Sequence, residues 1–160
     1  MKFWITFNEP WLFTLFGYDV GMMAPGIRNT GYGGYETAHI VIKAHAEAWH
    51  LYNDVYRSSQ QGEQTSLNMN RGHVLADVIQ LGLISITLNC DWKQPPPGDE
   101  TEESLEASLR GLEFMMGWFA HPIFLTGEYP PVYHKLSFIE SLWFGCRLTR
   151  ICMNFHVCMF

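Results

Sequence analysis

Glu9 follows a short alternating segment, stands beside Asn8, and is followed directly by Pro10. A carboxyl group presented from such a position can act as a general acid or base. In glycoside hydrolysis one carboxylic acid protonates the leaving oxygen, and in retaining enzymes a second carboxylate about 5 to 5.5 Å away attacks the sugar. A glutamate after a strand can also be an ordinary surface residue without a chemical role. The elements around Glu9 decide between these two interpretations.

The first of these elements is a predicted strand. Lys2–Phe7 alternates and is rich in β-branched and aromatic residues, and Pro10 cannot continue a central strand. A glycine-rich loop reaches to about residue 34. Apolar residues then recur every three or four positions over 35–56, which predicts an amphipathic helix.

A second strand and helix are predicted further along the chain. Ile84–Leu88 is a short β-branched run, and a proline-rich loop follows it. Periodic apolar residues then predict a helix from just after Asp99 to Phe119, with acidic residues at its start, where the helix dipole favours negative charge. The order strand, helix, strand, helix predicts parallel strands and an α/β fold.

The composition argues against several classes of protein. The net charge of −6, from 16 acidic and 10 basic residues, does not suit a nucleic-acid partner. The longest apolar run, 114–127, contains His121 and Pro122 and is shorter than the roughly 20 residues of a membrane span. No leader pattern follows Met1, so we expect a cytoplasmic protein.

Histidines and cysteines suggest metal binding as an alternative chemistry. Three histidines in the first predicted helix are six and five residues apart, a spacing that does not place them on one helical face: His39, His45 and His50. A C-terminal group with no zinc pattern comprises Cys146, Cys152, His156 and Cys158. We therefore expect no metal and no other cofactor, and we expect the cysteines, Cys90 included, to be reduced.

The residues around Glu9 also carry a family resemblance. Trp4-Ile5-Thr6-Phe7-Asn8-Glu9-Pro10-Trp11 is similar to the signature around the acid/base residue of family 1 glycoside hydrolases, which are retaining β-glycosidases. Further segments resemble the family in the same order: Gly17-Tyr18, Ala24-Pro25-Gly26-Ile27, Ala38-His39, His45-Ala46, Gly82–Trp92, Gly117–Pro122 and Gly127–Pro130.

The resemblance implies both a fold and a site. The fold would be a partial (β/α)8 TIM barrel, comprising about the fourth and fifth strands with their helices. Glu9 would be the proton donor, Asn8 would bind the sugar 2-hydroxyl, and the substrate would be a β-glycoside. Asn89, after the second strand, is a further candidate for substrate binding. Asp91 accompanies it, although a turn explains this pair equally well.

The likeness to the family is interrupted twice. We assign residues 1–131 to the partial barrel, with an unpatterned insertion at about 63–81, and residues 132–160 to a divergent tail. The family's nucleophile motif, Thr-Glu-Asn-Gly, does not occur in the 160 residues, so we expect this chain alone to be inactive. Two alternatives stay open: a non-catalytic interaction protein, like the klotho-like members, or a truncated product without function.

Overall fold

A computed structural model of the chain describes residues 3–57 and 82–135. The predicted insertion at about 63–81 lies outside the described residues. The second strand, which follows it, begins at Leu83. Most of the predicted tail, from residue 136 onward, also lies outside them. The division of the chain at residue 131 therefore stays a prediction.

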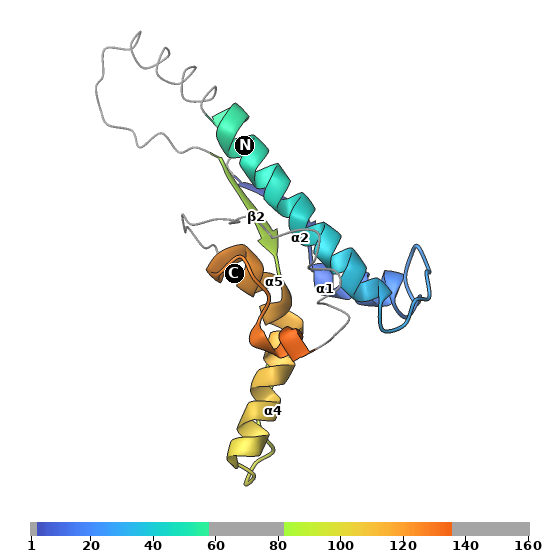
Figure 1. Ribbon diagram of the computed structural model, residues 1–160, viewed down its shortest axis with the longest axis vertical. Coiled ribbons are helices and arrows are strands. Elements are labelled where there is room, and N and C mark those ends of the chain that lie inside the picture. The colour runs from blue at the N-terminus through green and yellow to red at the C-terminus, as the bar shows by residue number, and fades with distance from the viewer. Residues whose placement is uncertain (1–2, 58–81, 136–160) are drawn as a thin grey trace, which may run out of the picture.

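Two strands form a parallel sheet in the described part of the chain. They are β1 (Phe3–Asn8) and β2 (Leu83–Thr87), with Phe3 opposite Leu83 at one end and Asn8 opposite Thr87 at the other. Both predicted strands and their parallel direction are confirmed. Parallel neighbours require a long connection, and part of that connection is a helix beside the sheet, as the α/β prediction requires (Figure 1).

Helices occupy most of the remaining described residues. Their bounds are α1 (Pro10–Tyr18), α2 (Gly33–Leu51), η1 (Tyr52–Tyr56), α4 (Glu102–Leu112), η2 (Glu113–Gly117), α5 (Trp118–Ala120), η3 (His121–Leu125) and η4 (Pro131–Lys135). Both predicted helices are confirmed, although each passes into wider π-type turns, at η1 and at η2. The helix α1 was not predicted. It begins at Pro10, whose fixed φ and missing N–H suit the first position of a helix.

The loop between α1 and α2 is fixed by one buried carboxylate. Asp19 Oδ2 accepts the backbone N–H groups of Gly31, at 2.9 Å, and of Gly34, at 3.3 Å. Gly34 lies in the first turn of α2, where a negative charge also interacts favourably with the helix dipole. The Asp19 carboxylate therefore holds the start of α2 against the end of α1.

Gly33 passes so close to α1 that a side chain does not fit. A Cβ on Gly33 would overlap the Tyr18 carbonyl oxygen and lie 2.9 Å from the carbonyl carbon. Because these are backbone atoms, the overlap cannot be relieved by a side-chain rotation. We expect Gly33→Ala to lower the free energy of unfolding by about 3 kcal/mol, the upper part of the range for overpacking.

Gly34→Ala is the matched control for this substitution. Its Cβ would meet Asp19 at 3.4 Å, an ordinary contact, and alanine is the better helix former. We expect a change within about 1 kcal/mol for this variant. Urea denaturation of the 160-residue chain and both variants measures the difference, and equal midpoints for the two variants would contradict the packing argument.

The core lies between α2 and the C-terminal half of the described chain. Ala38 and Ile42 of α2 are fully buried and belong to one cluster with Ile86 of β2. Tyr133, in η4, is also fully buried, and its ring centroid lies 5.7 Å from that of Trp118. Tyr133 lies outside the periodic apolar segments of the sequence, so it was not predicted as a core residue.

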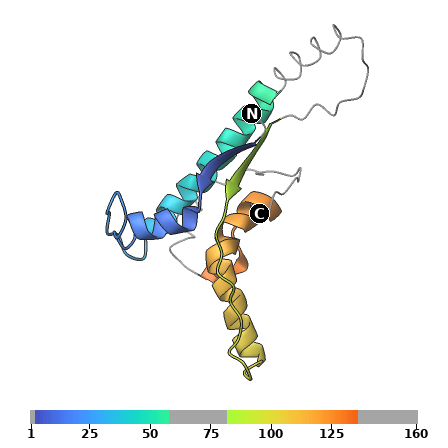
Figure 2. The same ribbon diagram turned by 180° about the vertical axis from the view of Figure 1, so that it is seen from behind.

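Other apolar side chains are not covered by any of the described residues. Phe3, Trp4 and Ile5 are consecutive in β1, yet each is about half exposed, at 56%, 49% and 53%. The helix α4 has no buried residue and projects away from the sheet (Figures 1 and 2). Exposed apolar strand residues at an open sheet edge are what a part of a larger barrel would leave.

Among the described residues, none of the helices combines the length and apolar character of a membrane span.

Candidate active site

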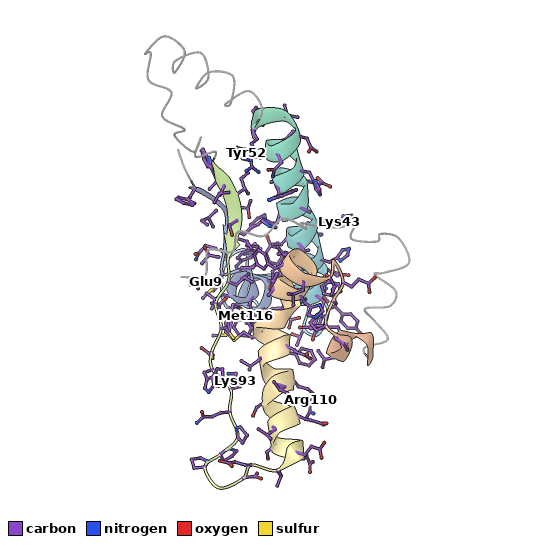
Figure 3. The ribbon with its side chains drawn as sticks, turned by 90° about the vertical axis from the view of Figure 1, so that its left-hand side faces the viewer. Glu9, Lys43, Tyr52, Lys93, Arg110 and Met116 are labelled. Carbon is purple, nitrogen blue, oxygen red and sulfur yellow. The ribbon has the colours of Figure 1, made fainter. Side chains whose placement is uncertain are left out.

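Glu9 stands at the junction of β1 and α1 in a left-handed backbone conformation. Its φ of 49° and ψ of 59° are uncommon for a residue other than glycine. Two backbone hydrogen bonds hold it there: Glu9 N–H donates to the Thr87 carbonyl at 2.9 Å, and Leu12 N–H donates to the Glu9 carbonyl at 3.0 Å. The side chain is half-buried, and in the view of Figure 3 Glu9 lies below Tyr52 of η1 and above Lys93.

Asn8 and Asn89 lie at the same end of the sheet as Glu9. Asn8 is exposed and is paired with Thr87 at the end of β2, and Asn89 follows Thr87 by two residues. The Asn89 Oδ1 atom is buried without a hydrogen-bond partner among the described residues. A buried acceptor of this kind is costly, so Asn89 has an unused hydrogen-bonding capacity at this end of the sheet.

Asp91 differs from the other candidates in its surroundings. Its carboxylate forms an exposed ion pair with Lys93 at 3.6 Å, and its N–H donates to the Met115 sulfur at 3.3 Å. Exposed pairs of this kind contribute little energy, typically about 0 to 1 kcal/mol. Asp91 therefore fits the turn interpretation as well as it fits substrate binding.

Two of the histidines weighed as metal ligands have protein partners. His39 Nδ1 lies 2.9 Å from the Tyr129 hydroxyl, and burial together with Lys43 lowers the pKa of His39. His45 Nδ1 lies 2.8 Å from Thr6 Oγ1, and burial lowers the pKa of His45 to about 4. Both rings link α2 to other elements of the fold.

Thr6 joins His45 to both strands. Its hydroxyl lies between the His45 ring and the Ser85 carbonyl oxygen of β2, which accepts its proton at 3.2 Å. The sequence alone does not predict this role of Thr6. The only signal was a threonine within an otherwise apolar strand, and the partner histidine is 39 residues away.

The combination of a strand-end Asn-Glu pair, a parallel neighbour and a following helix agrees with comparison to known proteins. The model of glycosyl hydrolase family 1 matches residues 1–142. The chain belongs to this family. The resemblance predicted from the sequence is thereby confirmed.

Individual relatives of this family 1 chain show the same likeness. Human lactase/phlorizin hydrolase is 43% identical over 152 residues, covering 94% of this chain and 7% of that protein. A crystal structure of a rice β-glucosidase has a TM-score of 0.62 and 33% identity, covering 79% of this chain and 24% of that one. Human Klotho is 35% identical over 130 residues, covering 81% of this chain and 11% of Klotho.

These comparisons define what the chain represents within family 1. It spans only a small part of each relative, so the catalytic machinery of a relative is not contained in it as a whole. The family is one of glycoside hydrolases, and the Klotho alternative is not better supported, since its identity is lower. The cytoplasmic location stays a prediction.

Proposed function

We propose that this chain carries the acid/base half of a β-glycosidase active site. Glu9 is the proton donor, Asn8 binds the sugar 2-hydroxyl, and Asn89 contacts the substrate on the leaving-group side. The strands β1 and β2 are the fourth and fifth strands of the family barrel. Without the rest of the barrel, the chain does not hydrolyse substrate.

The position of Glu9 is the observation that carries this proposal. Its backbone N–H bonds to Thr87, so the carboxyl group starts from the point where the ends of two parallel strands are joined. In parallel α/β barrels, catalytic groups are assembled at this end of the strands. The buried, unpartnered Oδ1 of Asn89 adds a free acceptor at the same end.

In the first chemical step, the protonated Glu9 side chain gives its proton to the glycosidic oxygen as the bond to the sugar breaks. The leaving group departs as a neutral alcohol, which is far more favourable than departure as an alkoxide. In this proposal Asn8 hydrogen-bonds the 2-hydroxyl, an interaction that strengthens in the transition state.

In the second step, the Glu9 carboxylate takes a proton from water as the water attacks the sugar. Both steps need a second carboxylate that forms the covalent intermediate. The 160 residues contain no Thr-Glu-Asn-Gly motif to supply it. The second carboxylate therefore has to come from outside this chain.

A chimeric barrel tests the proposal. Residues 3–57 of this chain replace the aligned segment of the rice β-glucosidase, which supplies the rest of the barrel. We expect the chimera to hydrolyse an aryl β-glucoside, because β1, α1 and α2 bring Glu9 and Asn8 as one unit. The release of the aryl alcohol is measured by absorbance.

The isolated 160-residue chain is the control for this experiment. We expect it to release no aryl alcohol above the buffer background, since the nucleophile is absent. A chimera that folds, as judged by circular dichroism, but has no activity would contradict the proposal. Activity of the isolated chain would show that the proposed division of the site is wrong.

A further inference from the structure

The strand β1 contains one residue more than β2 just before the candidate site. Ile5 is opposite Ser85 and Asn8 is opposite Thr87, so Thr6 and Phe7 together face one residue, Ile86. An extra residue of this kind is a β-bulge, which turns the following side chains to a different face.

The bulge decides where Asn8 points. In a regular strand Thr6 and Asn8 would share a face, because side chains alternate. Here Thr6 contacts His45 of α2, Phe7 packs against the core, and Asn8 is exposed. The consecutive residues Thr6 and Phe7 thus both face the side of the sheet that α2 and the core cover. Asn8 faces the opposite side, which the described residues leave open.

The hydrogen bonds of Thr6 hold this bulge and fix the proton on His45. The hydroxyl has a single proton, which it donates to the Ser85 carbonyl at 3.2 Å. The hydroxyl oxygen must then accept from His45 Nδ1, at 2.8 Å, so His45 is the Nδ1–H tautomer. A single hydroxyl therefore joins α2, β1 and β2 at the bulge.

The environment of His45 keeps it in this role. The side chain is 1% exposed, and its ring remains neutral at physiological pH because burial disfavours the charged form. Beyond the bulge, Glu9 has a left-handed backbone that costs of order 1 to 3 kcal/mol and persists only when its surroundings enforce it.

We propose that His45 is a positioning residue for the candidate site: through Thr6 it fixes the bulge that turns Asn8 and Glu9 to the open side of the sheet. The importance of this for catalysis rests on the function proposed above for Glu9. The geometry itself is independent of any activity, so it is tested by a readout other than hydrolysis.

The experiment uses nuclear magnetic resonance on the isotope-labelled 160-residue chain. Nitrogen shifts of the His45 ring report its tautomer, and backbone carbon shifts of Glu9 report its positive φ. Thr6→Val is the deciding variant, because it removes only the hydroxyl at nearly constant volume. We expect the Nδ1–H tautomer in the original chain, and in Thr6→Val the loss of the Glu9 shift pattern.

Conservative variants separate positioning from general stability. Thr6→Ser keeps the hydroxyl, and His45→Asn keeps an N–H donor close to the place of Nδ1, so both are expected to retain the Glu9 shifts. His45→Leu is expected to lose them. His39→Leu is the matched control: it removes another buried, hydrogen-bonded histidine of α2 and is expected to leave Glu9 unchanged.

Two results would overturn the inference. One is an Nε2–H tautomer of His45 in the original chain. The other is a Thr6→Val variant whose Glu9 shifts equal those of the original chain. Neither result depends on the chimera, so failure of the positioning role and failure of the proposed acid/base function are distinguishable.

Discussion

Replacing Glu9 by glutamine in the chimeric barrel is expected to lower kcat/KM for an alkyl β-glucoside by about 10²- to 10⁴-fold, the usual contribution of a general acid. Glutamine is close to glutamate in size but can neither give a proton to the leaving oxygen nor take one from water. The change therefore removes the proposed chemistry with little change of shape. Initial rates over a range of substrate concentrations measure it.

The dependence on the leaving group distinguishes lost acid catalysis from misfolding. A dinitrophenolate departs without protonation, so a dinitrophenyl β-glucoside should show a much smaller loss of kcat/KM than an alkyl β-glucoside. Glu47→Gln, an exposed carboxylate of α2 in the same transferred segment, is the matched control and should leave both rates unchanged. An equal loss of rate with both substrates would argue that Glu9 is not the proton donor.

Acidification from about pH 6.5 to pH 4 is expected to lower the free energy of unfolding of the 160-residue chain by about 3 kcal/mol through His45 alone. Burial lowers the pKa of His45 from 6.5 to about 4. In this window the unfolded chain binds a proton that the folded chain does not, so stability falls as the pH falls. Well above pH 6.5 both states are neutral at this ring, and the contribution no longer changes.

Urea denaturation at several pH values between 7 and 4 measures this slope, and His45→Asn removes its main source. His39, whose pKa is also lowered by burial, acts in the same direction. The variant should therefore lose less stability on acidification than the original chain does. Equal slopes for the two proteins would show that His45 is not the buried neutral group described here.

Several elements could be predicted because their signals are local. Alternation identified β1, a β-branched run identified β2, and a repeat of three and four identified α2. The helix α1 lacked such a signal: it is short, and a glycine, Gly17, lies at its end. Its formation depends on Pro10 at the start and on packing against α2, neither of which a periodic pattern reports.

The residues of the candidate site also have local signals, whereas long-range contacts do not. Glu9, Asn8 and Asn89 could be named from their motif and from their places after strands. Outside the candidate site, the contacts of Asp19 with Gly31 and Gly34 could not be predicted, because an aspartate in a glycine-rich loop has many possible partners within the chain. Long-range hydrogen bonds depend on how elements are packed, and packing is a property of pairs of segments.

The sequence by itself determined the family, the parallel strands and the carboxylate at the end of the first strand, because short motifs and periodicity encode these features within a few residues. Only the tertiary structure decided the bulge in β1, the link from His45 through Thr6 to Ser85, and the left-handed backbone of Glu9. The physical reason is that strand register and buried hydrogen bonds exist only between segments, and here their partners are 39 and 79 residues apart.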